Sequence, residues 1–375
     1  MLVSPGGLEN GGGIGRQMSY FLHEQDAHPQ DLSYKIVDTR GPWFLGRSPL
    51  YTGLSVFYLA LAMLKLLLAR VSPRPTVLHI NITGRGSTVR KTVLVTVARA
   101  VGLAYLLHVH DYNYCAEYLR RGALMRFLIS GMFHAAAKVL VLGAHEQQAL
   151  TQLLQLPPGR VLVLHNAVPD PRPDPATSRP HATCRLVFLG YLSARKGVPE
   201  LLQALASPAL LSRRWHATLA GGGPVDEFRQ LAATLGLAGR VDFPGWIDQR
   251  AAQAVCASAD ILVLPSHAEG LAMAVLEGLS HGLAVVATPV GAHGEVIEPE
   301  VSGLLVPPGD VEALAGALRR VIDDDALRGR LRTGARRRFL EKFDVRAYAD
   351  RLGRLHASLL GHRRDVAAIG EEQTL

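Results

Sequence analysis

Short apolar runs alternate with amphipathic stretches along most of this 375-residue chain. Strand-like runs lie at residues 2–5, 34–38, 76–80, 103–112, 138–142 and 161–166, and then at 185–190, 215–219 and 260–265. Helix-like stretches separate most of these runs. Strands buried on both faces of a parallel sheet are continuously apolar, and helices connect them. The pattern therefore predicts an α/β fold with parallel sheets.

The most apolar of the predicted helices spans residues 54–69. Its length of about 16 residues is short for a bilayer core of ~30 Å. Lys65 interrupts it and Arg70 ends it. We therefore expect a buried helix of an α/β layer and not a membrane span.

The basic excess of the chain lies in its first half. Residues 1–170 hold 16 Lys or Arg and 9 Asp or Glu, whereas residues 171–375 hold 24 and 23. No motif for nucleic acid accompanies this charge, so we expect no nucleic acid as a partner. An anionic membrane surface or a pyrophosphate-bearing substrate fits better, and ordinary solvated arginines are the alternative.

Cysteine usage favours a reducing, cytoplasmic compartment. The three cysteines, Cys115, Cys184 and Cys256, are far apart and form no Cys-x-x-Cys pair. We see no signal peptide at the start of the chain.

Two glutamates flank a predicted strand-to-helix turn in the second half. Glu269 and Gly270 follow the run 260–265, and Glu277 lies about two helical turns further on. Ligands of open α/β sheets bind at such turns. Carboxylates accept hydrogen bonds from hydroxyls, and amides at a helix N-terminus receive a phosphate. The pattern suits a polyhydroxylated anion, although a lone surface glutamate on an ordinary helix is the alternative for Glu277.

The order of motifs around these glutamates resembles a known family. Glu-Gly-x₆-Glu at 269–277 is followed by Gly-Leu-Ala-Val-Val-Ala-Thr-Pro-Val-Gly at 282–291 and by Gly-Leu-Leu-Val-Pro-Pro-Gly at 303–309. This run is similar to the family 4 retaining glycosyltransferases of GT-B fold, including exopolysaccharide and lipopolysaccharide types. The resemblance implies two Rossmann-like domains facing a cleft, a nucleotide-diphosphate sugar as donor substrate, and no metal or other cofactor.

The resemblance also assigns roles in the second half. Lys196 matches a cation that clamps the diphosphate, with Glu269 on the sugar and Glu277 on the ribose. Tyr191 stands where the family has an arginine, so the clamp requires Arg195 or Arg16, or activity is weakened. The remaining donor-binding residues implied are Gly222, Trp246, Ile247, Gly270, Leu271 and Ala272.

In the first half, Gly15 and Arg16 close a Gly-rich stretch that opens a helix. The family often has a donor-binding loop here. His108 and His110 are two residues apart on a predicted strand. His110 matches the family histidine near the reaction centre, whereas we expect His108 to pack in the core.

A basic stretch at residues 84–91 precedes a helix expected from Thr92. Arg85, Arg90 and Lys91 are predicted as acceptor-side contacts to an anion, and a solvated loop is the alternative.

A proline-rich stretch at 169–180 reads as a stiff linker. We predict a first domain at 1–168, a linker at 169–183 and a nucleotide-sugar domain at 184–342. The resemblance implies that a helix at 343–362 crosses back to the first domain, and a tail follows at 363–375.

Together these features predict a retaining hexosyltransferase of cell-surface polysaccharide biosynthesis. Its acceptor would be a glycan or a polyprenyl-diphosphate-linked sugar, and the enzyme would be cytoplasmic or peripheral at the inner face of the membrane. The alternatives are a GT-B sugar-nucleotide 2-epimerase and a non-catalytic sugar-nucleotide-binding or scaffold protein. An oxidoreductase is poorly supported, because Gly-x-Gly-x-x-Gly is absent near the first strand.

Overall fold

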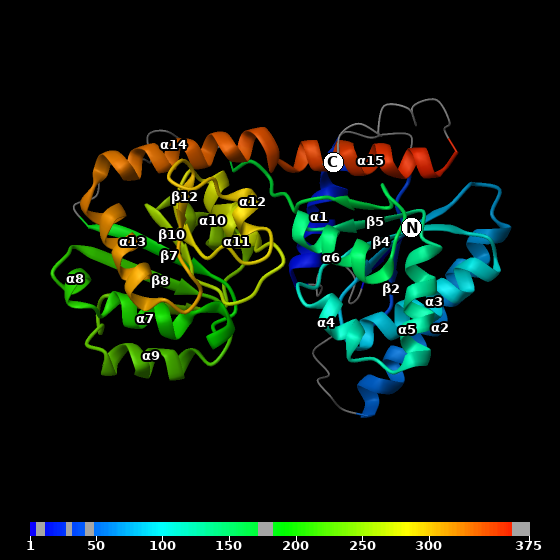
Figure 1. The fold of residues 1–375 in the computed structure, drawn as a ribbon, viewed down its shortest axis with the longest axis horizontal. Coiled ribbons are helices and arrows are strands. Elements are labelled where there is room, and N and C mark those ends of the chain that lie inside the picture. The colour runs from blue at the N-terminus through cyan, green and yellow to red at the C-terminus, as the bar shows by residue number, and fades with distance from the viewer. Residues whose placement is uncertain (5–11, 28–31, 42–48, 172–182, 362–375) are drawn as a thin grey trace. The chain divides into compact units, whose positions relative to one another are not determined.

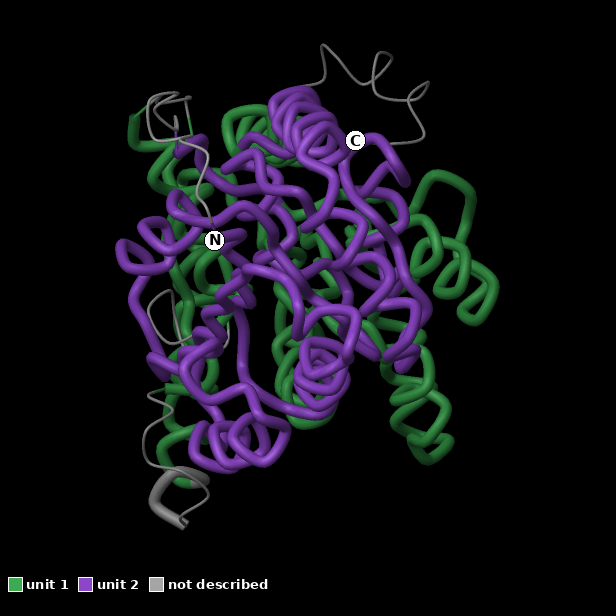
Figure 2. The backbone as a smooth tube through the Cα atoms, turned by 90° about the vertical axis from the view of Figure 1, so that its left-hand side faces the viewer, with its two compact units in different colours: residues 1–166, 345–375 green, residues 167–344 purple. Residues whose placement is uncertain are grey.

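The structure is a computed structural model, and it describes residues 1–4, 12–27, 32–41, 49–171 and 183–361. The chain forms two compact units, which Figure 2 distinguishes by colour. Unit 1 holds Met1–Asn166 with Val345–Leu375, and unit 2 holds Ala167–Asp344. Unit 2 begins at Ala167, whereas the predicted linker spans residues 169–183. Residues 172–182 of that linker lie outside the described residues.

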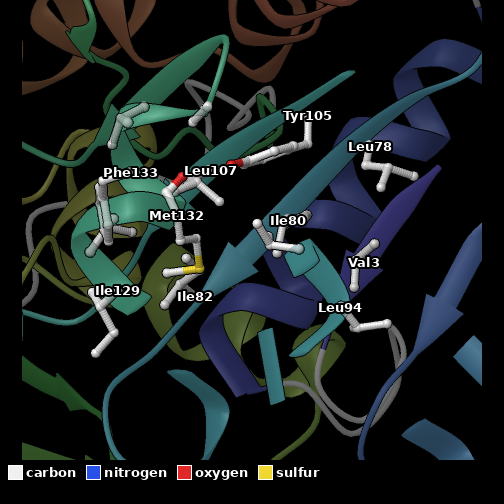
Figure 3. Packing of buried hydrophobic residues seen from close by; sticks show 14 of the residues in the cluster. Val3, Leu78, Ile80, Ile82, Leu94, Tyr105, Leu107, Ile129, Met132 and Phe133 are labelled. Atoms are coloured by element: carbon white, nitrogen blue, oxygen red, sulfur yellow. Dashed lines mark hydrogen bonds between the residues drawn. The ribbon is translucent and has the colours of Figure 1, made fainter. Parts of the chain in front are cut away.

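Unit 1 contains a parallel six-stranded sheet of order β2-β1-β3-β4-β5-β6. Its strands are β1 (Leu2–Ser4), β2 (Ile36–Asp38), β3 (Val77–Ile82), β4 (Ala104–Val109), β5 (Lys138–Val141) and β6 (Val161–Val163). Its helices are α1 (Gly12–Ala27), α2 (Pro49–Val71), α3 (Gly86–Ala100), α4 (Tyr114–Leu119), α5 (Ala123–His134), α6 (Ala144–Leu154) and α15 (Val345–Leu359). The sheet packs its apolar side chains against these helices, as Figure 3 shows for Ile80, Leu94 and Phe133.

Helix α15 joins unit 1 although it comes last in the sequence (Figure 1). Gln25 on α1 donates a hydrogen bond to the Ala349 carbonyl at 3.3 Å. The rings of Phe21 and Tyr348 meet edge to face, with centroids 6.3 Å apart. Residues 362–375, the end of the predicted helix and the tail, lie outside the described residues.

Unit 2 contains a second parallel sheet, of order β12-β11-β10-β7-β8-β9. Its strands are β7 (Cys184–Leu189), β8 (Trp215–Ala220), β9 (Val241–Gly245), β10 (Ile261–Leu264), β11 (Ala284–Ala287) and β12 (Gly303–Leu305). Its helices are η3 (Ala194–Lys196), α7 (Val198–Leu205), α8 (Pro208–Leu211), α9 (Val225–Thr234), α10 (Gln249–Ala257), α11 (Met273–Ser280), α12 (His293–Val296), α13 (Val311–Asp323) and α14 (Asp325–Lys342). The prediction of two Rossmann-like parallel-sheet domains is confirmed.

Helix α2 departs from the sequence prediction in length and in burial. It runs for 23 residues, from Pro49 to Val71, and starts well before residue 54. Ala62 and Leu66 are buried in the core of unit 1, as predicted for this helix. Phe57 and Leu68, however, are 61% and 58% exposed. The prediction of a buried helix therefore holds for one face only.

Helix α3 also begins earlier than predicted, at Gly86 and not at Thr92. Arg90 and Lys91 consequently belong to the helix and not to a loop before it. The turn between β3 and α3 shrinks to Thr83, Gly84 and Arg85.

Candidate functional site

The carboxyl ends of the strands in unit 2 form the edge on which the site is built. Strand β7 lies between β8 and β10, so the chain leaves β7 in one direction and β10 in the other. Loops that diverge in this way open a crevice, which is where ligands bind on open parallel sheets. Lys196 follows β7 and Glu269 follows β10, so both residues lie at this switch point.

Glu269 is the centre of a compact ionic cluster. Its Oε1 lies 2.6 Å from the Lys196 Nζ and 3.2 Å from the Arg195 Nη1. The Lys196 and Glu269 side chains are only 12% and 10% exposed, whereas Arg195 is 43% exposed. Burial of a carboxylate is costly unless it is paired, and here two cations share one carboxylate. The cluster therefore carries a net positive charge that suits an anionic ligand.

Two glycines permit the close approach of the loops that carry this cluster. Gly197 has φ 71°, and a Cβ there would lie 2.0 Å from the Pro265 carbonyl oxygen. Gly291 has φ 54°, and its Cβ would lie 2.2 Å from the carbonyl oxygens of Glu269 and Gly270. Any larger residue at either position would push apart the loops that follow β7, β10 and β11.

A buried histidine, which the sequence analysis did not single out, supports the start of α11. The His293 Nδ1 donates to the Thr288 carbonyl at 3.0 Å, and its Nε2 accepts from the Ala272 amide at 3.3 Å. Burial lowers the pKa of His293, while the nearby Glu269 opposes that shift. The ring is therefore a neutral cap in this structure. The Ala272 amide, predicted to receive phosphate, is instead already bonded to His293.

Glu277 does not join the cluster around Glu269 in any described ion pair. Glu277 lies half-buried on α11. Burial raises the pKa of the Cys256 thiol on α10, and the charge of Glu277 adds to that rise. Its predicted contact with a ribose stays a prediction.

The loops after β7, β8 and β9 are tied to one another at the same edge. The Leu192 amide donates to the Gly222 carbonyl at 2.8 Å, and the Gly221 amide donates to the Gly245 carbonyl at 2.8 Å. Trp246, next in the chain, is 76% exposed, and Ile247 is half-buried. An exposed indole on loops held together in this way is suited to a planar base.

Tyr191 is 62% exposed on the loop after β7 and carries no charge. Arg195, four residues later, shares the carboxylate of Glu269 with Lys196. Two residues were predicted to replace the missing arginine, Arg195 and Arg16. Arg195 lies in the same unit and in the same ionic cluster as Lys196. Arg16 is half-buried near the start of α1 in unit 1.

His110 lies at the corresponding carboxyl edge of unit 1. Its Nε2 lies 2.8 Å from the Asn81 Oδ1, and this hydrogen bond makes Nε2 the donor. Burial lowers the pKa of His110 to about 3, so the ring is neutral. The next residue, Asp111, accepts a hydrogen bond from the Gly84 amide at 2.6 Å, which fixes the turn after β3.

The prediction that His108 packs in the core is confirmed. His108 is fully buried, and its ring lies 4.0 Å from that of His110, centroid to centroid. His108 belongs to a row of hydrogen-bonded, buried histidines. Its Nδ1 lies 3.2 Å from the Nε2 of His79, and the Nδ1 of His79 lies 3.0 Å from the Nε2 of His356.

The three predicted anion contacts of residues 84–91 have different environments. Arg85 is exposed and has φ 58°, an uncommon conformation for a residue with a side chain. Arg90 is half-buried on α3. Lys91 is fully buried and donates to the Thr39 Oγ1 at 2.6 Å. Burial, with Arg90 nearby, lowers the pKa of Lys91 to about 7. Lys91 is therefore enclosed in the core with a partner of its own, and its predicted contact with an acceptor anion stays a prediction.

Gly15 is buried in the first turns of α1, because this helix already begins at Gly12. Residues 5–11, which include the start of the predicted Gly-rich loop, lie outside the described residues. Within the part of the chain that the structure describes, no group of three or more His, Cys, Asp or Glu could hold a metal ion.

Comparison with known proteins finds similarity to glycosyltransferases. The family model described as "Glycosyl transferases group 1" matches residues 183–324. The chain is 24% identical to alpha-D-kanosaminyltransferase of Streptomyces kanamyceticus over 75% of this chain and 77% of that protein. It is 34% identical to the lipopolysaccharide core biosynthesis glycosyltransferase LpsD of Rhizobium meliloti, over 48% of this chain and 53% of that protein. In seven curated relatives, LpsD included, the matched segment spans only 37–54% of the relative.

A solved structure shares the fold over almost the whole chain. HepE of Anabaena, determined in complex with UDP, superposes with a TM-score of 0.73 at 18% identity and covers 95% of this chain and 99% of that one. At this level of identity the likeness establishes the fold alone.

Proposed function

We propose that the chain is a group 1 glycosyltransferase that transfers a sugar from a nucleotide-diphosphate donor to an acceptor, which its similarity to such enzymes and its GT-B fold support. The proposal rests on the cluster of Lys196, Arg195 and Glu269 at the switch point of unit 2. The UDP bound to HepE and the glycosyltransferase names of the relatives support this choice of donor and reaction.

The cluster explains how the leaving group is stabilised. As the bond from the anomeric carbon to the diphosphate breaks, negative charge accumulates on the diphosphate. Lys196 and Arg195 lie at fixed positions within 3.2 Å of Glu269. Once the nucleotide sugar is bound, they donate hydrogen bonds to the charged oxygens of the diphosphate. Donors held in place before the reaction need no reorganisation and often supply a large part of catalysis. Glu269, relieved of one cation, accepts hydrogen bonds from the sugar hydroxyls and orients the donor.

We further propose transfer with retention of the anomeric configuration. A glycosidase-type double displacement requires two carboxylates about 5 Å apart on either side of the reacting carbon. The carboxylate of Glu269 is occupied by two cations, and Glu277 influences Cys256 on α10. These two residues are therefore poor candidates for such a pair.

The acceptor is proposed to be a glycan or a polyprenyl-diphosphate-linked sugar at the inner face of a membrane. The role of LpsD in lipopolysaccharide core biosynthesis supports this choice. Arg85, exposed at the carboxyl edge of unit 1, is available to an anionic acceptor.

A thermal-shift screen of UDP- and GDP-sugars tests the donor. A ligand that binds only the folded protein raises the melting temperature by mass action. We expect one nucleotide-sugar to stabilise the wild type, and Lys196→Ala to lose most of the shift. The stabilising donor is then incubated with candidate acceptors, and NMR reports the anomeric configuration of the product. The absence of a shift with every donor contradicts the proposal, and an inverted anomer contradicts retention.

Tyr191 favours a second candidate function, a non-catalytic sugar-nucleotide-binding protein, because the residue lacks the charge of the family arginine. Binding without release of nucleoside diphosphate, with or without acceptor, distinguishes it. A 2-epimerase would instead convert the nucleotide sugar to its C2 epimer without any acceptor.

A further inference from the structure

The exposed face of α2 is apolar over most of its length. Between residues 53 and 71 the exposed positions follow helical spacing, and every one except Arg70 is apolar or glycine: Gly53, Val56, Phe57, Ala60, Leu64, Leu67, Leu68, Arg70 and Val71. Val56, Phe57, Leu68 and Val71 are each more than half exposed. A helix on the surface of a soluble domain normally turns polar residues outward. This apolar face therefore indicates a contact that the isolated chain does not make.

The opposite face of α2 is committed to the protein core. Ala62 and Leu66 are 1% and 0% exposed and pack in the same cluster as Val37 and Leu78. The segment Gly53–Val71 is apolar and long enough to cross a membrane by composition, but only 17% of it is buried. A helix held to the core on one side cannot be surrounded by lipid on all sides. It can lie in the plane of a membrane surface with its outer face inserted.

The charge around α2 identifies what covers this face. Residues 39–110, which contain the whole helix, hold nine Lys or Arg and no Asp or Glu. Arg70 and Arg74 are exposed at the end of α2. A negatively charged lipid surface attracts such a basic segment, by about 1 kcal/mol for each cation near the surface.

A cavity beside the last turns of α2 strengthens this assignment. It has a volume of about 450 Å³ and lies against the first residues of β1, β2 and β3, at the edge of the sheet opposite to His110. Lys35, Lys65 and Arg74 line it, and Leu68 forms part of its wall. None of its described lining residues is acidic. Cations next to an apolar wall are suited to a molecule with an anionic head and an apolar tail.

A second apolar group lies on the same layer of helices. Helix α3 packs against both α2 and α5, and Figure 1 shows the three together in unit 1. Leu124 and Phe127 on α5 are 73% and 75% exposed, with Arg126 between them in the sequence. The combination of exposed apolar side chains and arginine is thus repeated on the same layer of helices as α2.

We propose that unit 1 docks on an anionic phospholipid bilayer through the exposed face of α2, with lipid phosphates at Lys65 and Arg74. This deepens the proposed function, since it assigns the surface that brings the site to a lipid-linked acceptor. A second copy of the chain is a poorer occupant. In a two-fold symmetric dimer the basic segment 39–110 would face its own copy and repel it.

Flotation of the full-length protein with vesicles tests the proposal. The protein is mixed with vesicles of phosphatidylcholine alone or with phosphatidylglycerol, and the bound fraction is measured at low and high salt. We expect binding to the anionic vesicles that is at least tenfold stronger than to the neutral ones and that salt weakens. The double variant Phe57→Ser/Leu68→Ser should lower the partition coefficient by about tenfold or more. Lys65→Gln/Arg74→Gln should lower it by about fivefold for each charge removed.

Two control variants carry the same changes on unit 2. Leu340→Ser removes an exposed leucine of α14, and Arg250→Gln removes an exposed cation of α10. Both should bind vesicles like the wild type. Circular dichroism melts check that every variant is folded.

Several results would overturn the proposal: no flotation of the wild type, equal binding to neutral vesicles, or equal losses in the controls. A wild-type dimer in light scattering that Phe57→Ser/Leu68→Ser dissociates would assign the face to a second copy. The same double variant should keep the thermal shift with donor in solution. A failure of docking is thereby separated from a failure of the proposed transferase function.

Discussion

Replacement of Glu269 by glutamine separates the two roles that the structure gives this residue. The glutamate holds Lys196 at 2.6 Å and Arg195 at 3.2 Å in a nearly buried setting. Glutamine has almost the same shape and still accepts a hydrogen bond, but it removes the negative charge between two cations. Glu269→Gln should therefore weaken the folded unit, strengthen the binding of a free diphosphate and impair transfer.

The size of each effect follows from these contacts. A hydrogen bond to a charged group contributes about 1.5–3 kcal/mol. The Lys196 contact is largely buried and counts in full, whereas Arg195 is 43% exposed and adds little. We expect a loss of about 2 kcal/mol in the free energy of unfolding, or roughly 4–8 °C in the melting temperature of a unit of this size.

Binding of UDP or GDP without sugar should change in the opposite direction. The two cations of the cluster lose their internal partner and interact fully with the diphosphate, so we expect about tenfold tighter binding. Transfer should fall by about 100-fold, because the sugar loses the group that orients it. Calorimetry measures the first quantity, and release of nucleoside diphosphate in the presence of acceptor measures the second.

Glu200→Gln is the matched control for this experiment. Glu200, in the first turn of α7, pairs with His267 on the loop after β10 at 2.8 Å, and it has no described ion pair with Lys196 or Arg195. It should change neither diphosphate affinity nor transfer. These roles of Glu269 are refuted if Glu269→Gln keeps wild-type stability and transfer. They are also refuted if Glu269→Gln weakens the binding of free UDP and GDP as much as Lys196→Ala does.

Three further predictions concern other parts of the molecule. Lys196→Ala should weaken nucleoside diphosphate binding by about tenfold or more, since a charge-assisted contact is lost; unchanged affinity in calorimetry speaks against the clamp. Trp246→Ala, at a side chain 76% exposed, should leave the melting temperature within about 1 °C but weaken donor binding, so an equal affinity for donor would remove Trp246 from the site. The third prediction concerns pH. Burial lowers the pKa values of His110 and His356 to about 3, so each ring stays neutral in the folded state. In the unfolded state each ring takes up a proton below about pH 6.5. The contribution of these two histidines to the free energy of unfolding should therefore be level above pH 6.5 and fall as pH drops from 6.5 towards 3, by up to about 1.4 kcal/mol per pH unit for each histidine; His356→Gln should flatten that slope, and an unchanged slope in urea melts contradicts the assignment.

The sequence was most informative where a motif and a strand end coincide. Lys196 and Glu269 were predicted from the order of glycine-rich motifs, and both lie at the switch point of the unit 2 sheet. Their direct ion pair was not predicted, because spacing along the chain does not report a contact between residues 73 positions apart. The parallel strands were predicted for a simple physical reason: they are buried on both faces and read as apolar runs.

The errors have physical causes as well. Lys91 was assigned to a basic loop before a helix expected from Thr92, whereas in the structure it lies inside α3 with Thr39 as partner. Helix α2 was predicted to be buried because the apolar stretch 54–69 is short for a bilayer and contains Lys65, and periodicity cannot tell a core-facing side from an exposed one when both are apolar.

His293 was overlooked for a different reason. It lies two residues after the matched segment that ends at Gly291, but a lone histidine there carried no distinguishing signal. Only the three-dimensional structure shows that its ring bridges Thr288 and the Ala272 amide at the start of α11.

Hydrogen–deuterium exchange with the donor that stabilises the protein locates the donor site. We expect donor to protect the backbone at residues 190–197, 221–224 and 265–272, the loops at the carboxyl edge of unit 2, and we expect Lys196→Ala to lose this protection at the same donor concentration. Protection that leaves these three loops unchanged, or that persists in full in Lys196→Ala, would contradict the proposed donor site.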